Sequence, residues 1–385
     1  MILIYPCREW VSVKKLLYIT NVDWFFISHR LPIAKEAINQ GYDVALACNF
    51  TGREDEIRAH GIRIYDIPLS RSGINIFKEL SSFISIVRVL KVFRPDIIHA
   101  ITIKPVIYGS LAAKLLSIKR RVFSISGLGF IYIDHGIKAR ILKKIAFIFY
   151  KFGLNNKSSS IIFQNDDDKK IFLESGITNY FSTHLIKGSG INLIDYKFIP
   201  INLNEDPPII MFISRLLKDK GLIEFCKSAK LLKSKNFRGR FVVIGDADLN
   251  NPNSISVQEL QEYKDSKIIE HWGFKENISQ EISKSLIIVL PSYREGFPKV
   301  LIEASSVGRP IITTDVPGCR DAIIENITGI KVPVKSIIPL ADSIQTLAED
   351  KSKCIEMGKA GRRYAEKNFN INQVIEKHLD IYKRG

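Results

Sequence analysis

The chain has 385 residues, about two and a half times the usual domain length, so two domains are expected. Its composition is 46% hydrophobic, 10% aromatic and 25% charged, which excludes collagen-like, low-complexity and disordered proteins. The charge is unusual, because 56 Lys and Arg against 40 Asp and Glu leave a formal net charge of +16. This excess indicates a polyanionic partner, for which nucleic acid, anionic phospholipid and a phosphorylated ligand are the candidates.

The excess charge is concentrated in the first half of the chain. Residues 1–190 carry 27 basic and 15 acidic side chains, a net charge of +12, and the remainder carries 29 and 25, a net charge of +4. Between Arg71 and Lys157, 16 basic residues stand against three acidic ones. We therefore expect the first half of the chain to meet the polyanion.

Cysteine spacing and hydropathy predict a cytoplasmic protein that is soluble or peripheral to a membrane. The five cysteines lie far apart and form no C-x-x-C pair, which argues against a disulfide framework or a zinc site. The apolar stretch 141–154 is interrupted by lysines, so no segment reaches the roughly 18 apolar residues of a membrane span. Residues 1–13 have no signal-peptide pattern and are expected to precede the first strand.

Short β-branched runs alternate with amphipathic stretches from residue 15 onwards. In the first half, strands are predicted over residues 15–20, 42–48, 62–67, 96–101, 121–126 and 160–164. Helices are predicted between them, over residues 28–40, 76–93, 105–116 and 137–154. This alternation is typical of a parallel sheet covered by helices on both faces.

The same alternation restarts after residues 188–205, where Gly, Asn and Pro accumulate. Strands are predicted over residues 209–214, 240–245, 267–271, 287–292 and 310–314. Helices are predicted over residues 219–235, 299–307, 337–349, 352–366 and 372–383. The fold class is therefore α/β, with two doubly wound, Rossmann-like domains facing each other across a cleft. The domains are expected over 14–188 and 189–368, and residues 369–385 form a helix that closes the second domain or crosses back to the first.

The most distinctive segment reads Y-R-E-G-F-P-K-V-L-I-E-A from Tyr293 and follows a predicted strand. Glu295 lies on the loop at the carboxyl end of that strand, and Pro298 leads the chain into a helix. Free amides at the start of this helix suit a phosphate, and Glu303 can bind a vicinal diol such as a ribose. Taken alone, the segment is also compatible with two ordinary solvated glutamates.

Two further motifs can bind anions. Arg215 and Lys220, in I-S-R-L-L-K-D-K-G, leave the predicted strand 209–214 and can converge on one dianionic group. Gly188 and Gly190, in K-G-S-G-I, lack a Cβ and let their amides approach an anion closely. Considered singly, the first motif is compatible with solvent-facing charges and the second with a simple turn.

Together, the three motifs resemble the nucleotide-sugar site of retaining family-4 glycosyltransferases of the GT-B fold. The resemblance runs from about Lys14 to Lys383. It includes P-D-I-I-H-A from Pro95, S-G-L-G-F from Ser126, I-G-D from Ile244 and E-G-F-P from Glu295. Within the family, the chain resembles bacterial transferases that add an N-acetylhexosamine to lipid-linked glycans of the O-antigen, capsule or N-glycan type.

The resemblance implies roles for individual residues. Arg215 and Lys220 would neutralise the donor diphosphate without a metal, Glu303 would bind the ribose, and Glu295 would contact the transferred sugar. Catalysis would then depend on Glu295, Arg215 and Lys220, which stabilise the departing diphosphate. The other predicted donor-binding residues, which would contribute mainly backbone contacts, are Gly188, Gly190, Gly245, Gly296, Phe297, Val300 and Leu301.

The chain departs from the family pattern at two places on the acceptor side. Ser126 replaces a histidine that many members carry before the Gly-Leu, so the identity of the donor sugar is open. The glycines of the first loop are also replaced, and His29 is expected to start the first helix, facing the acceptor or capping that helix. The acceptor-side or sugar-side candidates are His29, Arg30, Ser126 and Lys104, whereas His99 is expected to be structural.

Three other features have competing interpretations. Asp166–Asp168 could suggest a metal site, but they follow a strand and are better interpreted as the N-cap and first turn of a helix. Asp246 and Asp248 are expected to line the nucleotide pocket. The helix 137–154 interleaves lysines with Ile and Phe, as an interfacial membrane segment does, although core packing is the alternative.

The sequence thus predicts a glycosyltransferase peripheral to the inner face of the cytoplasmic membrane. It would move a sugar, specifically an N-acetylhexosamine, from a UDP-sugar to a polyprenyl-diphosphate-linked saccharide with retention of configuration. It would need no metal or other cofactor, would bind no nucleic acid, and would serve the assembly of lipopolysaccharide or other surface polysaccharide. Two alternatives stay open: a GT-B UDP-sugar epimerase, and a non-catalytic binder of anionic membranes or nucleic acid.

Overall fold

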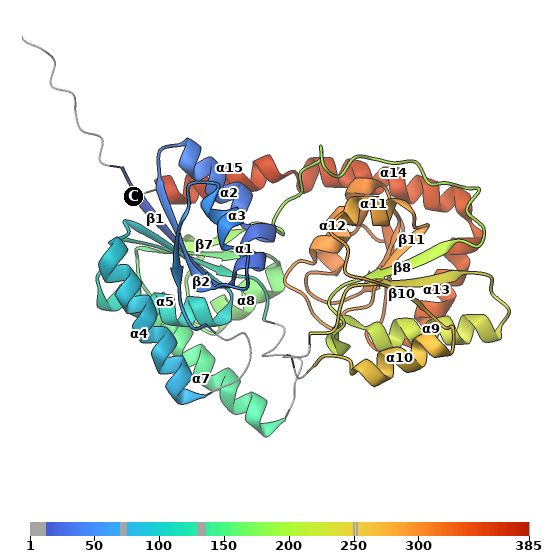
Figure 1. Ribbon diagram of the computed structural model, residues 1–385, viewed down its shortest axis with the longest axis horizontal. Coiled ribbons are helices and arrows are strands. Elements are labelled where there is room, and N and C mark those ends of the chain that lie inside the picture. Colours follow the sequence, from blue (N-terminus) through green and yellow to red (C-terminus); the bar gives the residue numbers. More distant parts are fainter. Residues whose placement is uncertain (1–12, 70–74, 129–135, 249–250, 252, 385) are drawn as a thin grey trace, which may run out of the picture. The chain divides into compact units, whose positions relative to one another are not determined.

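The structure is a computed structural model that describes residues 13–69, 75–128, 136–248, 251 and 253–384. Two parallel β-sheets form its framework, each flanked by helices (Figure 1). Most of the segment predicted before residue 14 lies outside the described residues. Four other positions used in the sequence analysis also lie outside them, namely Arg71, Gly129, Phe130 and Asp134.

The first sheet has seven strands in the order β3-β2-β1-β4-β5-β6-β7. Pairing is parallel between β1 and β2, β1 and β4, β2 and β3, and β6 and β7. The strand bounds are β1 Lys15–Val22, β2 Asp43–Asn49, β3 Arg63–Asp66, β4 Ile97–Ile101, β5 Arg120–Ile125, β6 Ser159–Phe163 and β7 Thr183–Leu185.

The second sheet has six strands in the order β10-β9-β8-β11-β12-β13, and its pairs are parallel throughout. The strand bounds are β8 Ile209–Ile213, β9 Arg240–Ile244, β10 Glu270–Gly273, β11 Ile287–Leu290, β12 Ile311–Thr314 and β13 Gly329–Val332. In both sheets the chain starts at a central strand, winds to one edge and returns to the other side. This is the doubly wound topology, so the predicted fold class is confirmed.

Helices connect the strands of both sheets. They are α1 Asp23–His29, α2 Leu31–Asn39, α3 Glu54–Arg58, α4 Ile76–Phe93, α5 Ile103–Leu115, α7 Ile137–Leu154, α8 Asp166–Glu174, α9 Leu222–Ser234, α10 Val257–Asp265, α11 Ile278–Ser283, α12 Lys299–Val307, α13 Ile337–Glu349, α14 Lys351–Asn368 and α15 Ile371–Lys383. Short 3-10 turns occur at η1 Tyr180–Ser182, η2 Lys218–Lys220 and η3 Arg320–Ala322.

The central strands are buried on both sides. Every residue of β4, β8 and β11 is buried, as expected for apolar strands with helices on each face. Because such strands have no polar face, the polar side chains that can carry chemistry lie beyond their carboxyl ends. This places the candidate site on the loops that leave the strands.

The density of internal contacts divides the chain into two compact units. Unit 1 comprises Met1–Phe123 with Ile381–Gly385, and unit 2 comprises Ser124–Asp380. In unit 1, the Tyr382 hydroxyl lies 2.6 Å from Nδ1 of buried His99 and 3.0 Å from the Tyr18 hydroxyl. The end of α15 is thereby fixed among the strands of the first sheet, and His99 is a core residue as predicted. The domain border predicted at residues 188 and 189 lies between β7 and β8 and stays a prediction.

Several predicted elements differ from those observed, and two examples show why. The helix predicted over 28–40 is two helices, α1 and α2, because Arg30 has φ −133° and leaves the helical region between them. The strand predicted over 267–271 is β10, which begins three residues later. Strands β7 and β13, of three and four residues, are too short for alternation to reveal them. Within the described part of the chain, no helix combines the length and hydropathy needed to cross a membrane.

Candidate active site

Glu295 and Lys220 meet where two neighbouring strands end. Strands β8 and β11 are paired, and their exits carry η2 and the loop 291–298 respectively. The Lys220 ammonium lies 2.6 Å from Oε1 of Glu295, and the Ser292 hydroxyl donates to the same oxygen at 2.7 Å. The side chains of Lys220 and Glu295 are 15% and 14% exposed, so both charges are largely withdrawn from water. Two predicted catalytic residues are therefore in direct contact.

Glycine makes the approach of these two loops possible. Gly221 follows Lys220 with φ +80°, and a Cβ there would lie 2.2 Å from the Pro291 carbonyl oxygen. The Tyr293 amide donates to the Asp219 carbonyl at 2.9 Å and fastens the two loops together. Any larger residue at position 221 would separate the strand exits and with them Lys220 and Glu295.

Glu303 is buried on α12 and faces a tyrosine. It is 7% exposed, and its Oε1 accepts a hydrogen bond of 2.8 Å from the Tyr196 hydroxyl. Lys299, one turn earlier, lies 3.6 Å from the same oxygen. Burial raises the pKa of Tyr196, and the neighbouring Glu303 charge raises it further, so the phenol stays a donor. The carboxylate predicted to bind a ribose is thus oriented by a residue that the sequence analysis missed.

Arg215 is paired with Asp248 rather than drawn into the Lys220–Glu295 contact. Its guanidinium lies 3.3 Å from Oδ2 of Asp248 and its side chain is 41% exposed. Gly245 has φ +124°, and a Cβ there would lie 1.9 Å from the Ser214 carbonyl oxygen. Gly245 therefore lets the exits of β8 and β9 approach, and it brings the Asp248 loop to Arg215.

The start of α12 agrees with the predicted helix 299–307. The helix begins at Lys299, and Pro298 is its N-cap residue. The Leu301 amide donates to the Pro298 carbonyl at 3.2 Å, whereas Val300 lies half-buried within the first turn. Phe297 is 7% exposed and packs edge-on against Phe369, with 5.4 Å between ring centroids. The packing of Phe297 therefore fixes the start of the helix, in addition to the backbone turn at Pro298.

Gly188 and Gly190, the two glycines of the K-G-S-G-I motif, have different neighbours. Gly188, with φ +68°, lies beside α12, where a Cβ would meet the Ile302 side chain at 2.7 Å. Gly190, with φ +75°, lies beside α15, where a Cβ would meet the Ile371 backbone at 2.8 Å. Gly188 is therefore close to the predicted donor residues, whereas the packing of α15 requires a glycine at position 190.

Within unit 2, Ser126 contacts the Glu295 loop. A Cβ on Gly296 would lie 2.0 Å from the Ser126 carbonyl oxygen and 2.9 Å from the Gln164 amide oxygen. The Ser126 hydroxyl is buried and has no hydrogen-bond partner among the described residues. The residue that replaces the family's histidine is thus brought next to the residue that follows Glu295.

The remaining acceptor-side candidates, His29, Arg30 and Lys104, lie in unit 1. His29 is the last residue of α1, so the expectation that it begins or caps the first helix was wrong, because that helix already starts at Asp23. Its ring stacks on Phe25 with 4.4 Å between centroids. Arg30 is 1% exposed and donates to the His29 carbonyl at 2.8 Å, and burial lowers its pKa. The Lys104 ammonium lies 2.5 Å from Glu79.

The three consecutive aspartates form the first turn of α8, as predicted, but the N-cap is Asn165. Its Oδ1 accepts from the Asp168 amide at 2.8 Å. Asp168 is 1% exposed and forms an ion pair with Arg294. Burial raises the pKa of Asp168, and the Arg294 charge opposes this rise. Among the residues that the structure describes, no group of three or more His, Cys, Asp and Glu could hold a metal ion.

The thiol of Cys319 is close enough to Glu295 to feel its charge. It is fully buried, and burial together with the Glu295 charge raises its pKa to about 12. The thiol is therefore protonated at neutral pH and is a poor nucleophile, since the thiolate is the reactive form.

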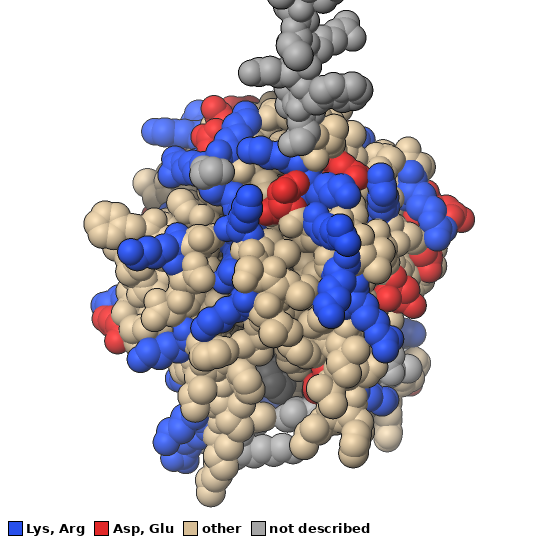
Figure 2. All heavy atoms as spheres, turned by 90° about the vertical axis from the view of Figure 1, so that its left-hand side faces the viewer, with Lys and Arg blue, Asp and Glu red and all other residues tan. Residues whose placement is uncertain are grey.

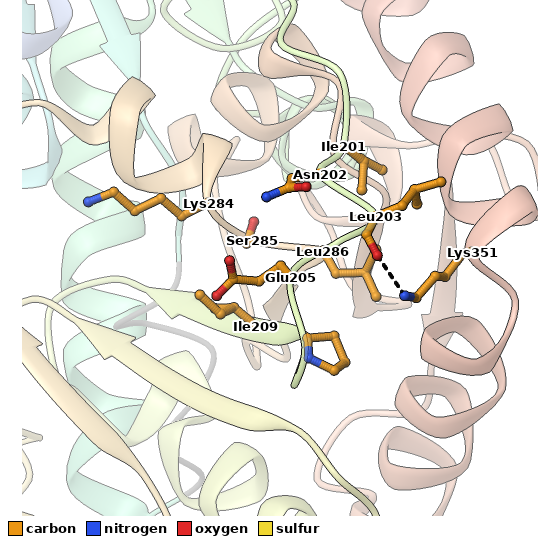
Figure 3. Close-up of a pocket in the computed structure, with 10 residues that line it drawn as sticks. Ile201, Asn202, Leu203, Glu205, Ile209, Lys284, Ser285, Leu286 and Lys351 are labelled. Carbon is orange, nitrogen blue, oxygen red and sulfur yellow. Dashed lines mark hydrogen bonds between the residues drawn. The ribbon is translucent and has the colours of Figure 1, made fainter.

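A small pocket elsewhere in unit 2 has no part in this site. It lies between residues 201–209, residues 284–286 just before β11, and Lys351, whose ammonium donates to the Leu203 carbonyl at 2.9 Å (Figure 3). Its volume is about 10 Å³, which holds one water molecule at most. It is too small for a nucleotide sugar.

Sequence reasoning did not assign three residues to the site, namely Ser292, Tyr196 and Asp168, the last of which it placed only at the start of a helix. Ser292 lies only three positions before Glu295, so the polar character of the strand exit was a usable signal. Tyr196 and Asp168 lie 107 and 126 positions from Glu303 and Arg294, respectively. No local pattern predicts such distant pairings.

Two family models match the chain. Residues 15–165 match the model described as "Glycosyl transferase 4-like", and residues 194–364 match the model described as "Glycosyl transferases group 1". The chain is 30% identical over 380 residues to the N,N'-diacetylbacillosaminyl-diphospho-undecaprenol alpha-1,3-N-acetylgalactosaminyltransferase of Campylobacter jejuni, covering 93% of this chain and 98% of that protein. It is 24% identical over 354 residues to the UDP-Gal:alpha-D-GlcNAc-diphosphoundecaprenol alpha-1,3-galactosyltransferase of Escherichia coli, covering 89% of each.

Solved structures share the fold across the whole chain. Sucrose-phosphate synthase from Thermosynechococcus elongatus superposes with a TM-score of 0.77 at 20% identity, covering 96% of this chain and 98% of that one. WaaG, a glycosyltransferase involved in lipopolysaccharide biosynthesis, superposes with a TM-score of 0.75 at 14% identity, covering 96% and 100%.

The two doubly wound parallel sheets, together with the family-model matches and the relatives, identify a glycosyltransferase of the GT-B fold. The chain belongs to the family of group 1 and family-4-like glycosyltransferases, as its own sequence motifs predicted.

Proposed function

We propose that the protein is a metal-independent, retaining glycosyltransferase that uses a UDP-N-acetylhexosamine. Its acceptor is a saccharide linked to polyprenyl diphosphate, at the inner face of the cytoplasmic membrane. In this proposal residues 189–368 bind the donor and residues 14–188 bind the acceptor. The observation that carries the proposal is the contact of 2.6 Å between Lys220 and Glu295. Buried Glu303 lies further along the chain, on α12.

The names of the relatives support the donor and acceptor classes. The Campylobacter protein is named for transfer of N-acetylgalactosamine to a diphospho-undecaprenol-linked sugar, and the E. coli protein for transfer of galactose from UDP-galactose to a similar acceptor. A third relative, 26% identical over 333 residues, is a capsular polysaccharide glycosyltransferase of Staphylococcus aureus. These names lend no support to an epimerase or to a non-catalytic binder.

The chemistry of the proposal balances without a protein nucleophile. The bond between the anomeric carbon and the diphosphate oxygen breaks, and an acceptor hydroxyl forms the new glycosidic bond on the same face. The acceptor proton passes to the departing UDP phosphate. Lys220 and Arg215 stabilise the charge that develops on this phosphate, which is the main catalytic effect expected of preorganised cations. Because these two side chains supply the positive charge, the proposal requires no metal.

The membrane part of the proposal is supported by α7. Its exposed face carries Ile137, Ile141, Ile148 and Phe152, which are 74%, 53%, 67% and 60% exposed and recur at helical spacing. The opposite side includes fully buried Tyr150, whose ring lies 5.1 Å from that of Phe172. Core packing therefore accounts for one side of the helix, and the membrane-interface alternative is the one that we propose for the exposed side. An exposed apolar helix face flanked by basic residues suits the membrane interface.

Basic side chains supply the electrostatic part of this attraction. Lys and Arg are spread over the face drawn in Figure 2, with few Asp and Glu among them. On α7 itself, Arg140, Lys144 and Lys151 are exposed. Not all of the basic window 71–157 contributes, because Arg121 is buried and Arg120 donates to the Ile381 carbonyl.

The proposal is tested with purified protein, a panel of UDP-sugars and a polyprenyl-diphosphate saccharide. UDP release, product mass and the anomeric configuration of the product are measured with and without EDTA. We expect an α-linked product from an α-configured UDP-N-acetylhexosamine, unaffected by EDTA. Interconversion of the UDP-sugar without an acceptor would instead identify an epimerase. Turnover that survives both Glu303→Ala and Lys220→Ala would overturn the assigned site.

A further inference from the structure

The loop that carries Glu295 is held on both sides by residues at the start of α8, the N-cap Asn165 and Asp168 of the first turn. Arg294, directly before Glu295, forms an ion pair with Asp168, and their side chains are 13% and 1% exposed. Gly296, directly after Glu295, offers its carbonyl to the Asn165 side-chain amide at 2.8 Å. All of these residues belong to unit 2.

Asn165 joins the two contacts into one network. Its amide nitrogen also donates to Oδ2 of Asp168 at 3.1 Å, and its Oδ1 accepts from the Asp168 backbone amide at 2.8 Å. Because Asp168 therefore accepts from Asn165 and Arg294 at once, the carboxylate has a single orientation. A buried hydrogen-bonded network fixes geometry more tightly than separate surface contacts do.

Close packing completes the support of the loop. The amide nitrogen of Gly296 would lie 2.8 Å from a Cβ on Gly127, and a Cβ on Gly296 would overlap the Ser126 carbonyl. On the other side, the Glu295 amide donates to the Pro317 carbonyl at 3.2 Å. The backbone at Glu295 is thus enclosed, and its side chain is left to meet Lys220 and Ser292.

We infer that Asp168 and Asn165 are positioning residues for Glu295, and that they hold its carboxylate at the transferred sugar through Arg294 and Gly296. This inference rests on the proposed function. Asp168 touches neither the sugar nor the diphosphate in this arrangement. Its effect is on the placement of the loop, and a displacement of about 1 Å can lower a rate about 100-fold.

Three conservative variants separate positioning from folding. Asp168→Asn keeps the shape of the side chain but removes the charge that Arg294 pairs with. Asn165→Asp keeps an N-cap acceptor for α8 but removes the donor to Gly296. Arg294→Lys keeps a positive charge, so its kcat should be closer to that of the wild type than the kcat of Arg294→Met. The matched control is Asp167→Asn, because Asp167 is 41% exposed and lies 3.5 Å from Arg320 in the same helix turn.

The measurements are the kcat and KM for transfer from UDP-N-acetylgalactosamine, the Kd for UDP alone and the melting temperature. We expect Asp168→Asn and Asn165→Asp to lower kcat about 10- to 100-fold. The Kd for UDP should stay within about threefold, because Glu295 is expected to meet the sugar rather than the nucleotide. Asp167→Asn should match the wild type in every measurement.

Two results would overturn the inference while leaving the proposed function intact. One is a kcat for Asp168→Asn and Asn165→Asp within about threefold of an active wild type. The other is a parallel loss of UDP affinity and melting temperature, which would show a general structural role. If the wild type transfers no sugar, the proposed function fails, and the inference is tested by affinity measurements instead. Asp168→Asn must then reduce the affinity for UDP-N-acetylgalactosamine more than that for UDP, and equal reductions would refute the positioning role.

Discussion

The ammonium group of Lys220 lies 2.6 Å from the carboxylate of Glu295, although the two residues are 75 positions apart in the chain. The contact pairs two charges that are largely withdrawn from water, and an unpaired charge there would be costly. It also defines a competition, because the lysine that the proposal assigns to the donor diphosphate is already held by a carboxylate. The phosphate must share or replace that partner when it binds.

Replacing Lys220 with alanine should strongly reduce catalysis. The variant removes the cation that stabilises the departing diphosphate and leaves the Glu295 charge without its nearest partner. We expect kcat for transfer to fall about 10²- to 10³-fold, the usual loss for one preorganised donor at a developing charge. The measurement is UDP release under saturating donor and acceptor.

Lys218→Ala is the matched control, since Lys218 is 48% exposed and lies 3.9 Å from Glu259. It should retain activity within about twofold, because exposed ion pairs at such distances contribute little. If Lys220→Ala retains more than about half of the wild-type rate, Lys220 does not serve the diphosphate.

Tyr196→Phe tests whether the orientation of Glu303 matters for the donor. The variant removes only the hydroxyl that donates to Oε1 of Glu303 at 2.8 Å. Losing a hydrogen bond to a buried charge costs about 1.5–3 kcal/mol, so KM for the UDP-sugar should rise about 10- to 100-fold. The kcat should change little, because the ribose is distant from the reacting bond.

A matched control is Tyr364→Phe, whose hydroxyl makes a weaker contact of 3.4 Å with the Asp321 carbonyl. Equal KM values for Tyr196→Phe and Tyr364→Phe would contradict the role of Tyr196. Isothermal titration measures the affinity of Tyr196→Phe for UDP and for a uracil base analogue that lacks the ribose. A loss of affinity for UDP but not for the analogue would place the effect at the ribose.

Gly296→Ala should damage both stability and activity. The added Cβ would lie 2.0 Å from the Ser126 carbonyl oxygen, which is backbone and cannot rotate away. Overpacking of this kind costs about 1–3 kcal/mol or more, and the displacement would move Glu295. Urea unfolding and UDP release measure the two effects.

Gly361→Ala in α14 provides the comparison. A Cβ there has no neighbour closer than 3.5 Å, and alanine stabilises a helix interior by about 0.5–1 kcal/mol relative to glycine. This variant should be at least as stable as the wild type and fully active. A Gly296→Ala protein with the same behaviour would show that the loop tolerates displacement.

The sequence predicted much of the fold because apolar runs and amphipathic periods determine it locally. Helices such as α4 and α7 were predicted residue for residue, since each is long and strongly patterned. Errors occurred where one residue ends an element, as at Arg30 between α1 and α2, or where a strand has three or four residues. Such short elements are formed by their sheet neighbours rather than by their own sequence.

The candidate site was predictable only as far as its motifs are contiguous. Glu295, Glu303 and Lys220 follow strands that the sequence reveals, and parallel neighbouring strands end at one edge of a sheet. The pairing of Glu303 with Tyr196 and of Arg294 with Asp168 depends on how distant segments pack, which no local pattern contains. The same reason explains why Arg30, expected at the acceptor, is buried in unit 1.

Asp23 should make stability depend on acidic pH. Burial alone would raise the pKa of this carboxyl. Hydrogen bonds from the Thr51 hydroxyl and from the amides of Thr51, Trp24 and Arg53 outweigh burial and hold the pKa below its usual range. Since the folded pKa lies below the unfolded value of about 3.9, the stabilisation is present above that value and disappears as pH falls through the folded pKa.

Asp23→Asn tests this dependence, because the asparagine NH₂ group would face amide donors that the carboxylate accepts. We expect the variant to be less stable at pH 7 by at least about 2 kcal/mol in urea unfolding. The difference from the wild type should shrink below about pH 4. A difference that is the same at pH 3 and pH 7 would exclude ionised Asp23 as its source. The matched control is Asp55→Asn, because the Asp55 side chain is 98% exposed. It should show no loss of stability at either pH.

The exposed face of α7 should bind anionic membranes through its apolar side chains and its lysines together. Burying a Leu, Ile or Phe side chain contributes about 1.5–3 kcal/mol, and each basic residue near an anionic surface about 1 kcal/mol. The triple variant Ile141→Ser, Ile148→Ser, Phe152→Ser should therefore reduce binding to phosphatidylglycerol vesicles by at least tenfold in sedimentation assays. The double variant Lys144→Glu, Lys151→Glu should weaken vesicle binding at low salt. At high salt, where exposed charges are screened, it should bind like the wild type.

Phe274→Ser is the control, because Phe274 is 69% exposed but lies outside α7. If the triple variant binds like the wild type, or if salt does not weaken binding, α7 is not the membrane-binding surface and the basic charge of the first half requires a different partner.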